Sequence, residues 1–221
     1  MTITKEAMAK MIDHTNLKAF SDEAAMKQLC DEAAEYGFAM VAINGAQVHR
    51  CAKWLEGTGV HVGATVGFPL GQTTLACKEF ETRDAIENGA DEIDYVINIS
   101  ELKDGNLAYI EEEMQKLTAI CREAGVMIKV IFENCYLTDE EKRAVAEIAK
   151  KVRPDYIKTS TGFGTGGATV EDVRLMKSVV GSDVKVKAAG GIRDHKTAVA
   201  MAEAGAERIG TSAGVEIMKA M

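Results

Sequence analysis

Several features that mark other protein classes are missing from this 221-residue sequence. No stretch of about twenty apolar residues could span a bilayer, and the opening MTITKEAMAKMIDHTNL lacks the uninterrupted apolar run of a secretory signal. Aromatic residues make up only 5% of the chain, and Lys and Arg are scattered rather than gathered into a basic block. With a net charge of −8, nucleic acid and anionic membranes are poor candidates as partners, and we expect a cytoplasmic protein.

Metal and disulfide patterns are missing as well. The cysteines are odd in number and none is spaced as CxxC, which argues against a zinc site and a disulfide framework. The four histidines form neither HxH nor HExxH, and we interpret each as a surface or helix-capping residue: His14, His49, His61 and His195. The sequence predicts reduced, mostly buried thiols and no metal site.

What the sequence does contain is a repeated strand-and-helix pattern. Eight short apolar or glycine-ended runs are predicted as strands: MIDHTN from 11, AMVAIN from 39, HVGATVGF from 61, EIDYVIN from 92, MIKVIFE from 127, YIKTSTG from 156, VKVKAAG from 184 and RIGTSAG from 208. Helical spacing fills the intervals. TDEEKRAVAEIAKKV begins with Thr138 as its N-cap, and SDEAAMKQLCDEAAEYG is expected to run from an N-cap at Ser21 to a terminating Gly37.

The spacing of these runs indicates the fold class. They start on average about 28 residues apart, the length of one βα unit, and no proline- or serine-rich linker divides them. With 47% hydrophobic residues the chain can bury one large core, so residues 1–221 are expected to form a single α/β domain, a (β/α)8 TIM barrel. Counting alone also allows an open doubly wound sheet, although the barrel is favoured.

Polar residues in the predicted strands are the candidates for function. Asn44, Asn98 and Glu133 end their strands, where a polar side chain can cap the next helix or meet water. Asp94 differs, because it lies within EIDYVIN and alternation places it on the face opposite to its apolar neighbours. A carboxylate in the middle of a strand needs a partner.

Two lysines supply candidate partners for Asp94. Lys158 in YIKTSTG and Lys187 in VKVKAAG precede glycine turns on strands that are neighbours in a barrel, so they should lie at similar height. The alternative is that both lysines reach the barrel rim and pair with acids there. Lys185 shares a face with Lys187, and we expect it at the solvent-facing lower end of the same strand.

A close pair of lysines can activate one of them as a nucleophile. Lysine attacks a carbonyl only when neutral, and with a pKa of roughly 10.4 about one in a thousand is neutral near pH 7.4. A second ammonium about 5 Å away, at an effective dielectric of about 20, costs roughly 3 kcal/mol, or about two pKa units. Partial burial can lower the pKa further, so Schiff-base chemistry is predicted.

Glycine-rich turns follow three consecutive strands. TGFGTGG follows the sixth, Gly190 and Gly191 follow the seventh before a helix expected at about Asp194, and GTSAG follows the eighth. Backbone N–H groups in such loops, near helix N-termini, suit a phosphate dianion. The alternative is that these glycines only make tight turns.

Seven segments in this order resemble deoxyribose-phosphate aldolase, a family of class I aldolases built as (β/α)8 barrels: IDHTNL, VGFPLGQTTLACKEFET, GADEIDYVIN, KVIFENCYLTDEE, DYIKTSTGFGTGGAT, KAAGGIRD and RIGTSAG. The resemblance implies that Lys158 forms the Schiff base, that Lys187 lowers its pKa and that Asp94 relays protons. It further implies residues that support the lysines or bind substrate and phosphate, namely Asp13, Thr161, Gly162, Gly190, Gly191, Gly210 and Ser212.

The implied reaction is reversible cleavage of 2-deoxy-D-ribose 5-phosphate to acetaldehyde and D-glyceraldehyde 3-phosphate, without a cofactor. The expected partners are these small phosphosugar and aldehyde substrates, and we expect a homo-oligomer, a dimer in the first instance. Two rival functions stay open: a Schiff-base enzyme for another phosphosugar, and a sugar-phosphate-binding module without activity.

The chain departs from the family pattern at some positions. VAING stands where many members read VCVNP, so Ala42 replaces a thiol and Gly45 a proline, and Phe163 stands where some members have a lysine beside the phosphate. The chain also ends soon after the eighth strand, without the longer tail of some relatives. The three positions expected to be catalytic are unaffected, but phosphate affinity and any tail-assisted proton transfer are open.

Overall fold

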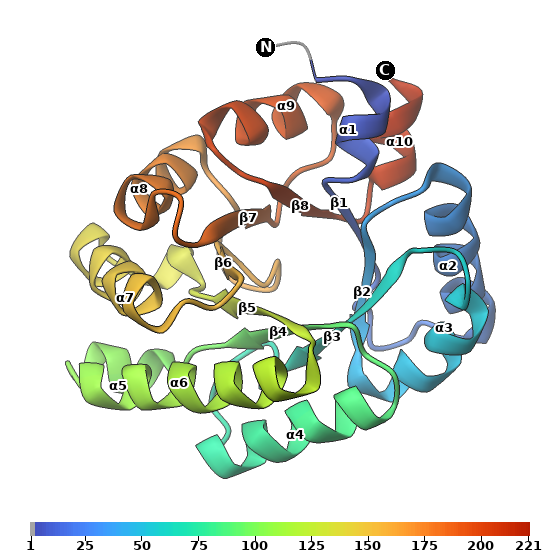
Figure 1. Cartoon of the computed structure of the whole chain (residues 1–221). Coiled ribbons are helices and arrows are strands. Elements are labelled where there is room, and N and C mark those ends of the chain that lie inside the picture. Colours follow the sequence, from blue (N-terminus) through green and yellow to red (C-terminus); the bar gives the residue numbers. More distant parts are fainter. Residues whose placement is uncertain (1–2) are drawn as a thin grey trace.

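A computed structural model describes residues 3–221 as a closed barrel surrounded by helices (Figure 1). Eight parallel strands pair in sequence order, and β8 pairs with β1 to close the sheet. The predicted (β/α)8 barrel is therefore confirmed, and the open doubly wound alternative is wrong.

The strands lie where the apolar runs predicted them. They are β1 (Ile12–Thr15), β2 (Met40–Asn44), β3 (His61–Val66), β4 (Glu92–Val96), β5 (Met127–Ile131), β6 (Tyr156–Lys158), β7 (Lys185–Ala189) and β8 (Arg208–Thr211). The α-helices are α1 (Lys5–Ala9), α2 (Glu23–Tyr36), α3 (Val48–Leu55), α4 (Leu75–Glu87), α5 (Ile99–Lys103), α6 (Leu107–Ala124), α7 (Asp139–Val152), α8 (Val170–Val180), α9 (His195–Ala204) and α10 (Gly214–Lys219). Two short 3₁₀ helices, η1 (Gly45–Gln47) and η2 (Asn134–Tyr136), follow β2 and β5.

Helix ends follow the expected capping chemistry with one correction. Thr138 caps α7 in a capping box with Glu141, as predicted. Helix α2 ends at Gly37 in the left-handed conformation, but its N-cap is Asp22 rather than Ser21. The Ser21 hydroxyl instead donates to Asn16 Oδ1 at 2.7 Å, so it is not available for the helix.

Alternation along the strands separates an apolar layer from a polar interior. On β4, Ile93 and Tyr95 belong to the apolar core that packs the sheet against the helices. Glu92 and Asp94 point the other way and make ion pairs with residues of other strands inside the barrel. The barrel is thus filled at its centre by buried charges rather than by the branched apolar side chains usual in this fold.

The state of the cysteines and the length of the helices bear on two further predictions. All five cysteines are free; Cys30, Cys51 and Cys121 are buried, whereas Cys77 is exposed, which confirms the prediction of mostly buried thiols. Across residues 3–221, no helix combines the length and apolarity that crossing a membrane requires.

Candidate active site

Asp94 binds three lysines in the middle of the barrel. Its Oδ2 accepts hydrogen bonds from Lys158 Nζ at 2.8 Å and Lys187 Nζ at 2.7 Å, and its Oδ1 accepts one from Lys129 Nζ at 2.8 Å. All four side chains are buried. The predicted pairing of Asp94 with Lys158 and Lys187 is confirmed, and the alternative in which these lysines reach the rim is wrong.

Strand register explains why these side chains meet. Asp94 pairs with Lys129 across β4 and β5, and Lys158 pairs directly with Lys187 across β6 and β7. Paired residues of neighbouring parallel strands project from the same face of the sheet, here into the barrel. The expectation that Lys158 and Lys187 lie at similar height is therefore confirmed.

Beneath this cluster lie an aspartate, a glutamate and an arginine, all buried. Lys187 contacts Asp13 at 2.5 Å, Arg208 Nε donates to Asp13 Oδ1 at 2.6 Å, and Arg208 Nη2 lies 3.1 Å from both oxygens of Glu92. Glu92 also pairs with Lys129. In this network Lys129, Lys187 and Arg208 each contact two carboxylates, whereas the ion pair of Lys158 is with Asp94 alone.

The burial and charges of the cluster determine the pKa of Lys158. Burial lowers the pKa of Lys158 to about 8, against the opposing pull of Asp94, and the charges of Lys187 and Lys129 lower it further. Burial is therefore the largest cause of the lowered pKa, and the neighbouring ammonium, which the sequence predicts as the main cause, contributes less. The three lysines hold the pKa of Asp94 well below its usual value although burial opposes this, so the carboxylate stays ionised.

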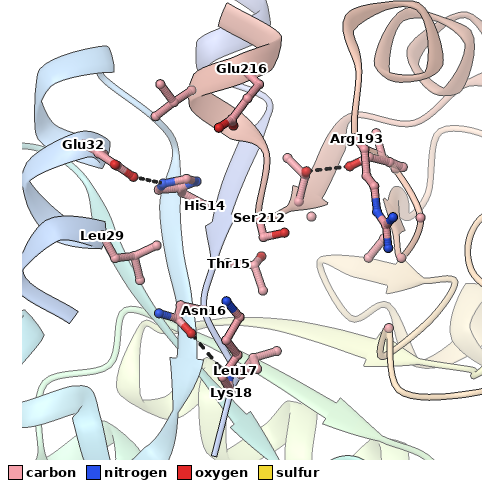
Figure 2. A pocket seen from close by; sticks show the side chains of 18 of the residues that line it. His14, Thr15, Asn16, Leu17, Lys18, Leu29, Glu32, Arg193, Ser212 and Glu216 are labelled. Atoms are coloured by element: carbon pink, nitrogen blue, oxygen red, sulfur yellow. Dashed lines mark hydrogen bonds and ion pairs between the residues drawn. The ribbon is translucent and has the colours of Figure 1, made fainter. Parts of the chain in front are cut away.

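A cavity of about 620 Å³ opens above the cluster at the carboxyl ends of the strands. Seven of the predicted site residues line it: Lys158, Thr161, Gly162, Gly190, Gly191, Gly210 and Ser212. Figure 2 shows Arg193 and Ser212, from the loops after β7 and β8, on the same cavity as Thr15 at the end of β1 and Leu17 of the loop that follows it. Asp13, Asp94 and Lys187 do not line the cavity and lie below it, within the barrel.

The glycine loops pack against one another along one wall of this cavity. Gly190 has φ +86, and a Cβ added at Gly167 would lie 2.3 Å from the Gly190 carbonyl oxygen. The Ala168 N–H donates to the carbonyls of Ala189 and Gly190 at 3.0 Å. Gly191 has φ +79 and open space where its Cβ would be, so its backbone can be approached by a ligand. Helix α9 begins after Asp194, its N-cap, as expected.

Glu133 corrects an expectation about strand ends. It was interpreted as a cap or a solvated residue, but it is buried and its backbone is left-handed, with φ +58. Its carboxylate accepts hydrogen bonds from the backbone N–H of Thr161 at 3.2 Å and from the Thr161 hydroxyl. Glu133 therefore fixes the loop after β6, directly beyond Lys158.

Of the other two strand-end residues, one caps a helix as predicted and one does not. Asn98 caps α5, since its side chain accepts a hydrogen bond from Glu101 N, as interpreted. Asn44 makes no side-chain cap of η1 and instead donates to the Leu17 carbonyl at 3.3 Å. Asn44 thus connects β2 to the first βα loop, which lines the cavity.

His14 is a second correction. It was interpreted as a surface or capping residue, yet it is buried, lines the cavity and lies with Nε2 2.7 Å from Glu32 Oε2 of α2 (Figure 2). Its position in β1 was predicted, but the pairing with Glu32 depends on how α2 packs against the barrel. Lys185, by contrast, is exposed at the start of β7 as expected, with Nζ 5.4 Å from the Tyr156 ring centroid.

Three members of the buried network were missed by sequence reasoning: Glu92, Lys129 and Arg208. The signal that located Asp94 applies to them too, because each stands an even number of residues from, or pairs in register with, a residue that faces the barrel interior. Phe163, at the departure from the family pattern, lines the cavity and packs edge-on against Phe68, with ring centroids 5.4 Å apart.

Together, the closed barrel and a buried lysine of lowered pKa at the floor of its C-terminal cavity define a barrel enzyme with an activated lysine. The chain belongs to the DeoC/LacD family of aldolases, whose model matches residues 7–220.

The relatives of the chain have closely related sequences and the same fold. It is 59% identical to deoxyribose-phosphate aldolase of Lactobacillus acidophilus, over 100% of this chain and 93% of that protein. It is 56% identical to deoxyribose-phosphate aldolase of Bacteroides thetaiotaomicron, over 99% and 92% of the two chains. The solved structure of tetrameric deoxyribose phosphate aldolase from Aeropyrum pernix is 30% identical and superposes with a TM-score of 0.92, covering 98% of this chain and 92% of that one.

Proposed function

We propose that the protein is an aldolase that reversibly cleaves 2-deoxy-D-ribose 5-phosphate to acetaldehyde and D-glyceraldehyde 3-phosphate. The observation that carries the proposal is Lys158, a buried lysine with a pKa of about 8 that lines the cavity. At that pKa about one lysine in ten is neutral at pH 7, roughly two hundredfold more than for an unperturbed lysine. The relatives named deoxyribose-phosphate aldolase support this choice of substrate.

In the proposed mechanism, neutral Lys158 attacks the C1 aldehyde, and loss of water gives an iminium. The positive nitrogen accepts the electron pair of the breaking C2–C3 bond while the C3 hydroxyl loses its proton and becomes the carbonyl of the leaving aldehyde. D-Glyceraldehyde 3-phosphate leaves, the enamine is protonated at carbon, and hydrolysis releases acetaldehyde and restores the amine. The reaction needs no cofactor, because the protonated imine is itself the electron sink.

We assign proton transfer to Asp94 and Lys187. Asp94 Oδ2 lies within hydrogen-bond distance of both lysine nitrogens, so one oxygen can exchange protons with either. Lys187 also contacts Asp13, which keeps Lys187 in place beside Lys158. Asp13 is thereby proposed to support the lysines from below rather than to touch the substrate.

We place the substrate phosphate at the loops after β6, β7 and β8. Gly162, Gly190, Gly191, Gly210 and Ser212 line that part of the cavity, and their backbone N–H groups can bind an anion. Thr161, held by Glu133, lies between these loops and Lys158. Arg193 and Lys18 line the same cavity and can supply positive charge where Phe163 replaces the lysine of some relatives.

Borohydride trapping tests the proposal. Treatment with borohydride in the presence of deoxyribose 5-phosphate or acetaldehyde should reduce the imine to a stable secondary amine on the peptide that contains Lys158. Peptide mass spectrometry reads out the site, and Lys158→Met is the matched control that should give no adduct. An adduct only on other lysines would remove Lys158 from the mechanism.

The two rival functions give different results in the same assays. A sugar-phosphate-binding module would bind deoxyribose 5-phosphate without any trapped adduct. An aldolase for another phosphosugar would give an adduct on Lys158, but a panel of aldehyde donors and acceptors would favour a different pair.

We further propose that residues 1–221 form one catalytic domain in a cytoplasmic homo-oligomer. One barrel uses all eight strands, and free thiols suit a reducing compartment. A dimer is the first expectation, whereas the Aeropyrum pernix relative is described as tetrameric. Light scattering coupled to size-exclusion chromatography distinguishes the two assemblies.

A further inference from the structure

A line of contacting charged side chains runs through the barrel from its N-terminal end to Lys158. It starts at His61, the first residue of β3, whose side chain is 44% exposed and whose Nδ1 lies 2.7 Å from Glu92 Oε1. Glu92 pairs with Lys129, and Lys129 Nζ donates to Asp94 Oδ1 at 2.8 Å. Asp94 Oδ2 in turn accepts from Lys158 at 2.8 Å.

We propose that His61 and Glu92 are positioning residues for Lys158, which set through Lys129 and Asp94 how firmly this lysine holds its proton. The inference rests on the proposed function in taking Lys158 as the reacting lysine. Its measurable consequence, the proton affinity of Lys158, does not depend on turnover.

Competition for Glu92 is the physical basis. Its two oxygens serve three cations on three different strands: His61 on β3, Lys129 on β5 and Arg208 on β8. When His61 and Arg208 interact more strongly with Glu92, Lys129 interacts less with Glu92 and more strongly with Asp94. Asp94 then stabilises the charged form of Lys158 less, and Lys158 gives up its proton more readily.

The surroundings of His61 favour its charged form. The hydrogen bond to Glu92 raises the pKa of His61 above its ordinary value despite partial burial, and Asp91 raises it too, whereas Arg208 opposes both. Asp91 is itself held in place, because its Oδ2 accepts a hydrogen bond from Val62 N at 2.8 Å. The charge of His61 is therefore one that solvent pH can change at the far end of the barrel from the cavity.

The size of the coupling follows from the barrel geometry. Asp94 pairs with Thr65, four residues beyond His61 on β3, and Lys158 Nζ lies 2.8 Å from Asp94 Oδ2, so His61 and the Lys158 ammonium are roughly 12 to 15 Å apart. At an effective dielectric of about 20, one unit charge at that distance shifts a pKa by about half a unit to one unit. A positive charge at position 61 should lower the pKa of Lys158, and its removal should raise it.

The test measures the pKa of Lys158 directly in the full chain. Each variant is treated with a trace of acetic anhydride from pH 6 to 10, and acetylation of the Lys158 peptide is quantified by mass spectrometry. His61→Lys carries a fixed charge and His61→Gln carries none, and both should fold because the side chain is half exposed. We expect the pKa of Lys158 to be half a unit to one unit lower in His61→Lys than in His61→Gln, with the wild type between them.

Glu92→Gln gives a second reading, because losing the acid frees Lys129 for Asp94 and should lower the pKa of Lys158 by about one unit or more. The matched control is Lys185→Gln, an exposed charge at the same end of the barrel whose Nζ lies over the Tyr156 ring, which should shift it by less than about 0.2 units. If Glu92→Gln does not fold, the two His61 variants still decide.

Two results would overturn the inference: the same Lys158 pKa in both His61 variants, or a shift in Lys185→Gln as large as that in His61→Gln. The second result would mean a general field effect rather than action through Glu92. Borohydride trapping of the wild-type protein tests the proposed function separately. If trapping fails, the proposed function is wrong, but the acetylation experiment still shows whether His61 changes the pKa of Lys158.

Discussion

Lys158 and Lys187 pair directly across β6 and β7 and donate hydrogen bonds to the same oxygen of one carboxylate, that of Asp94. One negative charge cannot fully compensate two ammonium groups. Lys187 has a second acid, Asp13, at 2.5 Å, whereas among residues 3–221 the ion pair of Lys158 is with Asp94 alone. The excess positive charge therefore destabilises the protonated form of Lys158. Burial is the main cause that lowers its pKa to about 8, and this repulsion lowers it further.

Replacing Lys187 with Met should therefore move the pH–rate profile upward. Removing a like charge about 5 Å away raises the pKa of Lys158, by about two units from Coulomb's law at an effective dielectric of about 20. Activity depends on the neutral amine and rises with pH through this pKa, so Lys187→Met should be nearly inactive at pH 7 and recover partly toward pH 10. The measurement is kcat/KM for deoxyribose 5-phosphate from pH 6 to 10.

Lys185→Met is the matched control for that experiment, since Lys185 lies on the same strand but is exposed. Its profile should superpose on that of the wild type. Normal borohydride trapping at neutral pH with no turnover at any pH, in Lys187→Met, would reject the electrostatic role. Lys187 would then act in proton transfer after the imine has formed.

Asp94→Asn should separate imine formation from turnover. The charge of Asp94 raises the pKa of Lys158, so its loss should lower that pKa and leave trapping at pH 6 to 7 as fast as in the wild type or faster. Turnover should fall by about 10² to 10⁴, because the proton relay is lost. Loss of trapping in a variant that still shows the native circular dichroism spectrum would contradict this.

The fold could be read from the sequence because its information is local. Period and length predict eight βα units, and capping residues such as Thr138 and Gly37 mark helix ends through contacts within a few residues. Asp94 and its lysines were predictable for the same reason, since alternation within a strand decides which face a side chain occupies. The same rule places Lys129 and Glu92 on the interior face of their strands.

Other parts of the site depend on contacts between distant segments. His14 meets Glu32 only because α2 packs over β1, and nothing in the sequence around His14 specifies that partner. Glu133 adopts a left-handed backbone that glutamate rarely favours, stabilised by its bonds to Thr161, 28 residues away in sequence. Conformations fixed by tertiary contacts of this kind are not encoded in local residue patterns.

Gly191→Leu should impair use of the phosphorylated sugar selectively. The added side chain meets open space at this cavity-lining position, so it should fill the volume that a phosphate would approach. KM for deoxyribose 5-phosphate should rise by tenfold or more, with a much smaller change for free deoxyribose. Gly125→Leu is the matched control, because Gly125 also has a positive φ of +71 and open space, but caps α6 away from the cavity. Equal effects on both sugars would remove this loop from the phosphate site.

Prolonged chelation should leave activity unchanged. In the proposed mechanism the iminium nitrogen withdraws the electrons of the breaking bond, which is the task a metal ion performs in metal-dependent aldolases. The measurement is kcat before and after extended dialysis against a chelator. Loss of activity that a divalent ion restores would replace the Schiff-base mechanism with a metal-assisted one.

A second buried ion pair, Lys78 with Glu113, should contribute to stability in a non-additive way. Both side chains are fully buried between α4, α6 and the end of β4; Lys78 Nζ donates to Glu113 Oε1 at 2.6 Å and to the Val96 carbonyl at 2.7 Å. Glu113 Oε2 accepts from Asn98 N at 3.0 Å. Burial lowers the pKa of Lys78 and raises that of Glu113, which shows how much desolvation opposes the pair.

Lys78→Met or Glu113→Leu alone leaves one buried charge without its partner, so each should lower the free energy of unfolding by about 3–5 kcal/mol. The double variant removes both charges, so its loss should be well below the sum of the two single losses. It still leaves the Val96 carbonyl and the Asn98 N–H without these side-chain partners, at a cost of about 1–3 kcal/mol each if no other group replaces them. Urea unfolding of the wild type, both single variants and the double variant gives the coupling energy directly. Additive losses would show that the two side chains act independently, because a true buried pair must make the second substitution far less damaging than the first.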